Sequence, residues 1–426
     1  MSERDLSNED LRRALEALRN GVPNRDAVRV LGCSQTEVVE RFLARLDAVD
    51  GDALKHRQTN GMLVAGEFGS GKSHLLEYLR HLALERGFVC SLIVVSKETP
   101  LYDPAKVFAA AVESAMATGI TGEVIKEIAL RLDATSPAYG EFFRWADDPA
   151  SGISTVFPAT LLIRERLTGD PEMDEKIGNF WAGERLPIAD VRQGMKQIRQ
   201  AATYQLRSPA ARELPRQRFA FVSRLMRAAG YRGWVLLIDE VELIARYSRL
   251  QRAKAYAELA RWMGQVETAQ YPGMLALATI TVDFEAKVLR ETGDRDFVRP
   301  FLEHRGTEES LALAAEAETG MREIERRAIP LNPPDNASLR HTYEALRQIH
   351  GDAYDWTPPD LPVGATSITR QMRSYVRRWI NEWDLRRLYP GEAIETVETE
   401  LTIDYSESPD LLVESDQSSP DSPAGA

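Results

Sequence analysis

One stretch of the chain has residue types and spacing that suit the binding of a phosphate chain. Residues 66–73 read G-E-F-G-S-G-K-S and fit the pattern G-x-x-x-x-G-K-[ST] at every fixed position. An apolar run at 62–65 precedes this stretch, and leucines at helical spacing follow it. Strand, glycine loop and helix are therefore expected in the order that a nucleotide-binding loop requires.

Each part of this loop has an expected task. The three glycines are expected to take positive φ, so that backbone N–H groups face the phosphates at the positive end of a helix. Lys72 is predicted to reach the β- and γ-phosphates of ATP, and the Ser73 hydroxyl to bind Mg²⁺. The predicted nucleotide-binding residues are Gly66, Glu67, Phe68, Gly69, Ser70, Gly71, Lys72, Ser73 and His74.

A pair of acids follows another apolar run, at 234–238. Asp239 and Glu240 follow this run directly, and the carboxyl ends of parallel strands face the ligand. Asp239 is predicted to hold the Mg²⁺ together with Ser73, and Glu240 to orient and deprotonate an attacking water. Many strands end in surface acids, but beside a phosphate loop this pair predicts nucleotide hydrolysis.

Three further side chains are candidates for contact with the γ-phosphate. Thr281 ends an apolar run at 274–281, where filling of the strand by a β-branched residue is the alternative. Arg370 and Arg373 lie one turn apart near the start of a predicted helix at 367–388, where exposure to solvent is the alternative. The predicted catalytic residues are therefore Lys72, Glu240, Thr281, Arg370 and Arg373.

A parallel sheet is needed to bring these residues together. Apolar runs predict strands at 62–65, 88–95, 234–240, 274–281 and 328–331. The pattern between the second and third strands is helical almost throughout, over about 104–230. The expected fold is α/β, with a five-stranded parallel sheet, a long helical insertion and a small C-terminal helical lid.

The chain divides into four expected regions. Residues 1–60, with helices at 6–20 and 36–49, are expected to pack on an ATPase core at 61–332, with a lid at 333–390 and an acidic, largely disordered tail at 391–426. Residues 393–405 alternate enough for an edge strand. Residues 28–32 are expected either to line an adenine pocket or to pack beside the sheet.

Composition narrows the class of protein. Of the residues, 43% are hydrophobic and 28% charged, and no apolar run approaches the roughly 20 residues of a membrane helix. The first residues lack the pattern of a signal peptide, and the two cysteines are too few for a disulfide framework. These features predict a cytoplasmic protein that does not enter a membrane.

The net charge of −12 comes mostly from one end of the chain. Residues 389–426 carry ten Asp or Glu and no Lys or Arg, which leaves −2 for the rest. Only a local patch could therefore bind double-stranded DNA, and the best candidate is the arginine-rich segment 207–232. A solvated helix face is the alternative. The seven arginines of this segment are Arg207, Arg212, Arg216, Arg218, Arg224, Arg227 and Arg232.

The order of the predicted strands makes the chain similar to AAA+ ATPases. A closer resemblance, carried by residues 19–23, 66–76 and 98–101, is to the ATP-binding P-loop proteins of BREX phage-defence systems. It spans about residues 10–390 and implies an ATPase subunit of a bacterial defence system that works with other subunits. By this resemblance Thr281 would be the first sensor and Arg370 or Arg373 the second. No unmistakable winged helix follows the lid.

Two functions follow from these patterns. The first is an ATP-hydrolysing switch or motor that acts with DNA and partner proteins, in which Arg295 or Arg299 of a neighbouring copy would complete the site of a homo-oligomer. The second is a nucleotide-gated interaction protein that binds ATP with little turnover. A P-loop kinase is disfavoured, because Glu240 suits water better than a bound alcohol.

Overall fold

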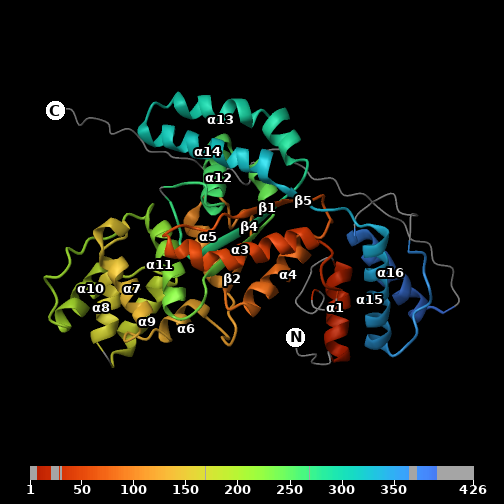
Figure 1. Cartoon of the computed structure of the whole chain (residues 1–426), viewed down its shortest axis with the longest axis horizontal. Coiled ribbons are helices and arrows are strands. Elements are labelled where there is room, and N and C mark those ends of the chain that lie inside the picture. The colour runs from red at the N-terminus through yellow and green to blue at the C-terminus, as the bar shows by residue number, and fades with distance from the viewer. Residues whose placement is uncertain are drawn as a thin grey trace, which may run out of the picture.

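A five-stranded parallel sheet lies at the centre of the molecule (Figure 1). The computed structural model of the chain describes residues 7–20, 28, 31–167, 169–267, 269–363 and 372–390. The strands are β1 (Met62–Ala65), β2 (Val89–Val94), β3 (Trp234–Asp239), β4 (Met274–Ile280) and β5 (Ile329–Pro330), in the order β2-β3-β4-β1-β5. The prediction of an α/β fold around a parallel five-stranded sheet is confirmed.

The central strands are apolar because both of their faces are covered. Every residue of β1, β3 and β4 is buried. Alternate side chains of β1 enter two different cores, with Met62 and Val64 in one and Leu63 in the other. Continuous apolar runs are typical of such doubly covered parallel strands, which explains why these strands are readable from the sequence.

The two faces of the sheet carry different helices (Figure 1). The helices α3 (Thr36–Leu54) and α4 (Lys72–Glu85) share a core with one face. The other face packs against α5 (Pro104–Glu113), α11 (Leu214–Ala228), α12 (Arg249–Trp262) and α14 (Glu308–Arg327). A π-helix at Glu285–Glu291 and α13 (Asp294–Glu303) precede α14 between β4 and β5.

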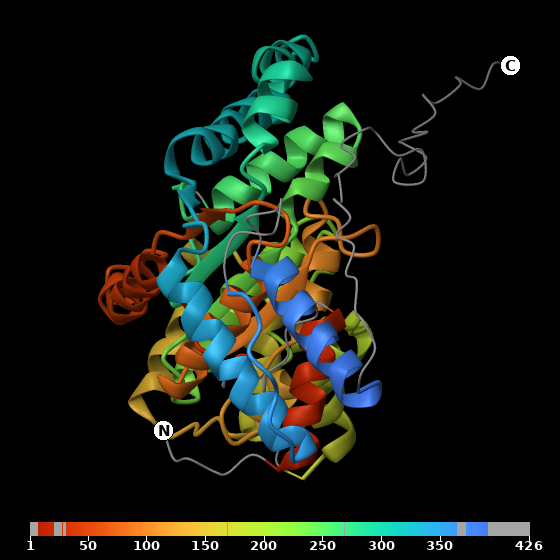
Figure 2. The ribbon, with the colours of Figure 1, turned by 90° about the vertical axis from the view of Figure 1, so that its right-hand side faces the viewer.

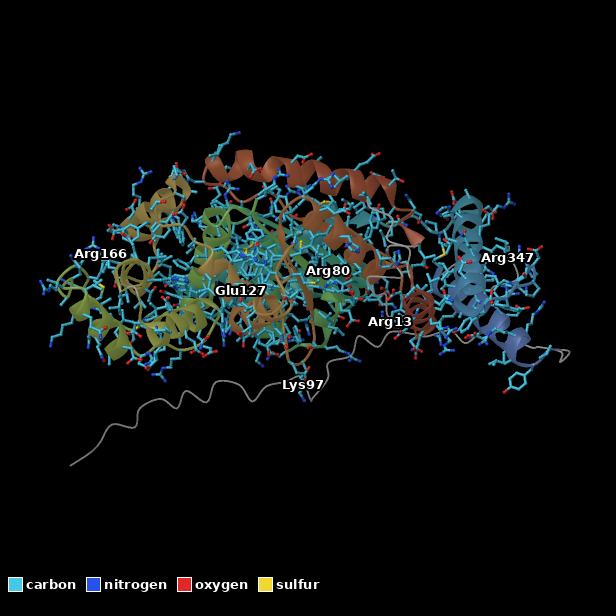
Figure 3. The ribbon with its side chains drawn as sticks, turned by 90° about the horizontal axis from the view of Figure 1, so that it is seen from below. Arg13, Arg80, Lys97, Glu127, Arg166 and Arg347 are labelled. Atoms are coloured by element: carbon cyan, nitrogen blue, oxygen red, sulfur yellow. The ribbon has the colours of Figure 1, made fainter. Side chains whose placement is uncertain are left out.

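The predicted helical insertion extends from α5 to α11, between β2 and β3. Its further helices are α6 (Val124–Leu130), α7 (Pro137–Asp147), α8 (Val156–Arg166), α9 (Pro171–Trp181) and α10 (Ile188–Gln197). Aromatic rings fill its centre, where Phe221 lies 4.8 Å from Phe157 and 5.3 Å from Trp181 between ring centroids. Arg166 of this insertion lies at the opposite end of the molecule from Arg347 (Figure 3).

Three helices form a separate bundle at that other end (Figure 2). They are α1 (Asn8–Asn20), α15 (Asn336–Tyr354) and α16 (Met372–Leu388), and they share an apolar core that includes Leu15, Leu346 and Trp379. The tail at 391–426, with the strand predicted at 393–405, lies outside the described residues.

The position of α1 corrects one expectation. Residues 1–60 were expected to pack on the core, and α3 does so, but the buried apolar side chains of α1 belong to the bundle with α15 and α16. The apolar stripe of α1 predicts that one face of this helix is covered. The pair α15 and α16, packed alone, would likewise leave an apolar face uncovered. The stripe itself does not specify which element covers it.

Candidate nucleotide-binding site

The register of the sheet brings the ends of three strands to one edge. Ala65 of β1 pairs with Ile280 of β4, and the Gly66 N–H donates to the Ile280 carbonyl at 3.0 Å. Asp239 ends β3, next to β4. The loop that follows β1 therefore starts at the same edge of the sheet as the carboxylate of Asp239, with β4 between them.

Two hydroxyl groups orient the Asp239 carboxylate. Ser73, in the first turn of α4, donates to Asp239 Oδ2 at 2.6 Å, and Thr279 of β4 donates to Oδ1. The predicted pair of Ser73 and Asp239, which are 166 residues apart in sequence, thus lies in direct contact. The sequence favoured Thr281 over Thr279 as the polar contact from this strand, but Thr281 is buried just beyond β4 and does not line the cavity described below.

The glycines of the loop have two different tasks. Gly69 and Gly71 have φ of 75° and 95°, and Gly71 is the residue that caps the N-terminus of α4. Gly66, in contrast, does not have a positive φ, which corrects the expectation for this position. Its role is spatial, because a Cβ there would lie 2.5 Å from Ser70 Oγ and 2.9 Å from Leu331 Cδ1.

Lys72 is held across the mouth of this loop. Its Nζ donates to the carbonyls of Gly66 at 3.1 Å and Glu67 at 3.2 Å, and its side chain is buried. An ammonium group has three N–H donors, so these two bonds leave one donor for another acceptor. Glu242 Oε1 lies near it, at 3.8 Å from Nζ.

Glu240 occupies a strained backbone position directly after β3. Its φ of 61° and ψ of 36° place it in the left-handed region, which is costly for a residue with a side chain. Its N–H donates to Asp239 Oδ1 at 3.0 Å. Partial burial and the neighbouring Asp239 raise the pKa of its carboxyl, and Lys72 opposes this shift. A carboxylate whose pKa is raised is a better proton acceptor than an ordinary one.

Glu242 is a site residue that the sequence reasoning missed. It lies on a 3₁₀ helix at Val241–Arg246, and only 6% of it is exposed. Burial raises the pKa of its carboxyl to about 7, with Lys72 opposing the shift and Asp239 adding to it. The available signal was a third acid in the run D-E-V-E, at residues 239–242.

The raised pKa of Glu242 predicts a pH-dependent stability. Between pH 4.5, the ordinary pKa of a glutamate, and about pH 7, this carboxyl is protonated in the folded protein but ionised in the unfolded chain. The free energy of unfolding therefore falls as pH rises through that window. Glu242→Gln imitates the protonated acid and removes the contribution of residue 242 to the pH dependence of stability. We expect the variant to exceed the parent in free energy of unfolding by about 2–3 kcal/mol at pH 8 and much less at pH 5. Urea unfolding at both values tests this, and an equal difference at both would contradict it.

A cavity of about 660 Å³ opens over these residues, between the sheet and the three-helix bundle. The predicted residues from Phe68 to His74 line it, together with Asp239 and Glu240. Leu31 and Gly32, from the stretch expected to border an adenine pocket, also line it, and His74 Nε2 lies 2.7 Å from the Gly32 carbonyl oxygen. Leu18 of α1 and Val376 of α16 close the apolar side.

Arg373 links the bundle to the phosphate loop. Its N–H donates to the Gly69 carbonyl at 3.3 Å, and its guanidinium lies 5.8 Å from the Phe68 ring centroid and donates to the Asn20 carbonyl. Burial lowers the pKa of this guanidinium. The other predicted lid arginine, Arg370, lies outside the described residues.

The arginines proposed for other tasks lie away from the cavity and are engaged within the chain. Arg295 and Arg299 of α13 form ion pairs with Glu318 of α14. In the arginine-rich segment, four side chains form ion pairs with acids and two lie over aromatic rings. The ion-paired residues are Arg212, Arg216, Arg227 and Arg232, and those over rings are Arg218 and Arg224. Arg207 alone of the seven remains exposed without such a contact in the described structure.

The residues present fit a magnesium-bound triphosphate. The hydroxyl of Ser73 and the carboxylate of Asp239 are hard oxygen donors, which Mg²⁺ prefers, and such an ion takes its other ligands from phosphate and water. No group of three or more His, Cys, Asp or Glu that could hold a metal alone occurs in the described ranges. Three residues that line the cavity each have a buried atom without a hydrogen-bond partner among the described residues: Ser70 Oγ, Glu242 Oε2 and Arg373 Nε. Such atoms are expected where a ligand completes the site.

Comparison with known families identifies a match over most of the chain. Residues 6–128 and 216–385, which make up more than half of the chain, match the family model described as "BREX system ATP-binding protein BrxC/D". The break between the matched stretches, at 129–215, contains α7 to α10 of the helical insertion. No curated protein and no solved structure matches the chain.

Proposed function

Since the chain belongs to the BrxC/BrxD family of BREX system ATP-binding proteins, we propose that it hydrolyses Mg²⁺-ATP in the cavity between the sheet and the bundle. The observation that carries this proposal is the contact between Ser73 of the phosphate loop and Asp239 of β3. A glycine loop alone can bind phosphate, but a hydroxyl and a carboxylate that share one position provide for a metal ion as well.

The roles of the individual residues follow from their positions. The loop N–H groups and the remaining donor of Lys72 bind the phosphates, and Ser73 and Asp239 would hold Mg²⁺, which would supply neutralisation of the phosphate charge. Glu240 accepts the proton of the attacking water, and Arg373, which lies beside the loop, binds at the outer phosphate. Arg370 and Thr281 remain predictions for the same step.

Partners are proposed on narrower grounds. Membership of a BREX family suggests other subunits of that defence system as partners. Double-stranded DNA is not part of the proposal, because six of the seven arginines in the candidate segment are engaged within the chain. No helix in the described ranges is both long enough and apolar enough to cross a bilayer.

Phosphate release from ATP by the purified full chain tests the proposal. We expect turnover that requires Mg²⁺ and disappears with a chelator, because the metal position is part of the site. Nucleotide binding measured by calorimetry in the same buffer separates the two functions. Tight binding of ATP without turnover, alone and with the other BREX subunits added, would contradict hydrolysis and favour the nucleotide-gated interaction protein.

A further inference from the structure

A buried carboxylate lies beside the lysine that contacts the phosphates in the proposed function. Glu242 Oε1 is 3.8 Å from Lys72 Nζ, and both side chains are only 8% exposed. The other two N–H donors of Lys72 are bound to the carbonyls of Gly66 and Glu67. Glu242 is therefore placed to interact with the one donor that is left for a phosphate oxygen.

The charges around this position are strongly unbalanced. Glu242, Asp239 and Glu240 come from one short segment, and Lys72 of α4 is the cation that faces them in the described structure. Asp239 is bound by two hydroxyls, but Glu242 Oε2 is buried without a hydrogen-bond partner among the residues that the structure describes. A buried, poorly solvated carboxylate acts strongly on other charges nearby, because little water screens it.

We propose that Glu242 is a specificity-determining residue that weakens the binding of a nucleoside triphosphate relative to a diphosphate. The inference rests on the proposed function of the same cavity. A diphosphate is bound mainly by the backbone N–H groups of the loop, whereas a third phosphate adds negative charge at Lys72 and the acidic segment. Glu242 competes with that phosphate for the last donor of Lys72 and repels it. The fraction of sites that hold ATP, and not ADP, therefore falls more readily when the ratio of ATP to ADP falls.

Equilibrium binding by four proteins tests this inference. The parent, Glu242→Gln, Glu242→Asp and Glu267→Gln are titrated by calorimetry at pH 8 with Mg²⁺-ADP and with the non-hydrolysable β,γ-imido analogue of ATP. Glu242→Gln removes the charge and keeps the shape, and Glu242→Asp keeps the charge. Glu267→Gln is the matched control, because it removes the same charge from an exposed position that does not line the cavity.

We expect Glu242→Gln to raise the ratio of Kd for ADP to Kd for the ATP analogue by at least threefold, through tighter binding of the analogue. Glu242→Asp and Glu267→Gln are expected to stay within twofold of the parent ratio. Inorganic tripolyphosphate and pyrophosphate are expected to show the same shift, because the effect concerns phosphate charge and not the base. Thermal unfolding of the ligand-free proteins confirms that each variant is folded.

Several results would overturn the inference. A ratio that changes less than twofold in Glu242→Gln would do so, as would equal tightening for both nucleotides, which would indicate a general effect on the fold. These failures differ from failure of the proposed function. If the parent binds neither nucleotide, the proposed function is wrong, whereas a parent that binds and hydrolyses ATP with an unchanged ratio in Glu242→Gln contradicts only the role of Glu242.

Discussion

Replacing Lys72 by methionine is expected to weaken the binding of Mg²⁺-ATP by about 100-fold or more, which corresponds to about 2.7 kcal/mol. The ammonium group is positioned by two carbonyls, and charge-assisted hydrogen bonds to phosphate are among the strongest polar contacts. The variant also removes the cation that faces the buried Glu242, so an attractive charge for the phosphates is lost. Calorimetric titration with the non-hydrolysable analogue measures the effect.

The matched control for this result is Lys97→Met. Lys97 is exposed and points away from the body of the molecule (Figure 3). It carries the same charge and does not line the cavity. The Lys97→Met protein is expected to bind the non-hydrolysable analogue with the same Kd as the parent. A Lys72→Met protein that is folded and binds within threefold of the parent would mean that the loop does not hold the phosphates.

Replacing Glu240 by glutamine is expected to reduce the rate of ATP hydrolysis by about 10²–10³-fold while leaving nucleotide affinity nearly unchanged. Removal of a general base commonly costs this much, and an amide cannot accept the proton of the attacking water. The change keeps the volume of the side chain, so the left-handed backbone of residue 240 is not further disturbed. Steady-state phosphate release gives the rate, and calorimetry gives the affinity.

Two comparisons make this second prediction decisive. Glu291→Gln changes an exposed acid that does not line the cavity and is expected to keep the parental rate. Glu242→Gln separates the two candidate bases, because Glu242 is also acidic, buried and close to Lys72. Hydrolysis that survives in Glu240→Gln but is lost in Glu242→Gln would transfer the role of base to the buried residue.

The features that the sequence could predict are those determined over short stretches. The strands were predictable because β1, β3 and β4 are buried on both faces and therefore read as continuous apolar runs. The contact of Ser73 with Asp239 was predictable because parallel strands end at a common edge. In both cases a local pattern and one general rule of sheet geometry were sufficient.

Other features depend on contacts between distant segments. The choice between Thr279 and Thr281 depends on the register of β4 against β3, which pairs Ile238 with Ala278 and so brings Thr279 next to Asp239. The role of Glu242 depends on its burial against Lys72, 170 positions away in the sequence. The arginine-rich segment looked like an anion-binding surface because its acidic partners, such as Asp50 and Glu258, lie on other helices. Charge runs do not reveal such partners.

The composition of the three-helix bundle also constrains how the protein folds during translation. The helix α1 leaves the ribosome long before α15 and α16 exist, since the chain from Asn20 to Asn336 must be made in between. Leu11, Leu15 and Leu18 therefore lack their native cover while the sheet assembles. Contacts between segments so far apart in sequence slow folding, and until they form the apolar side chains are exposed and prone to aggregation. The nascent chain is thus expected to depend on chaperones until α16 has been synthesised.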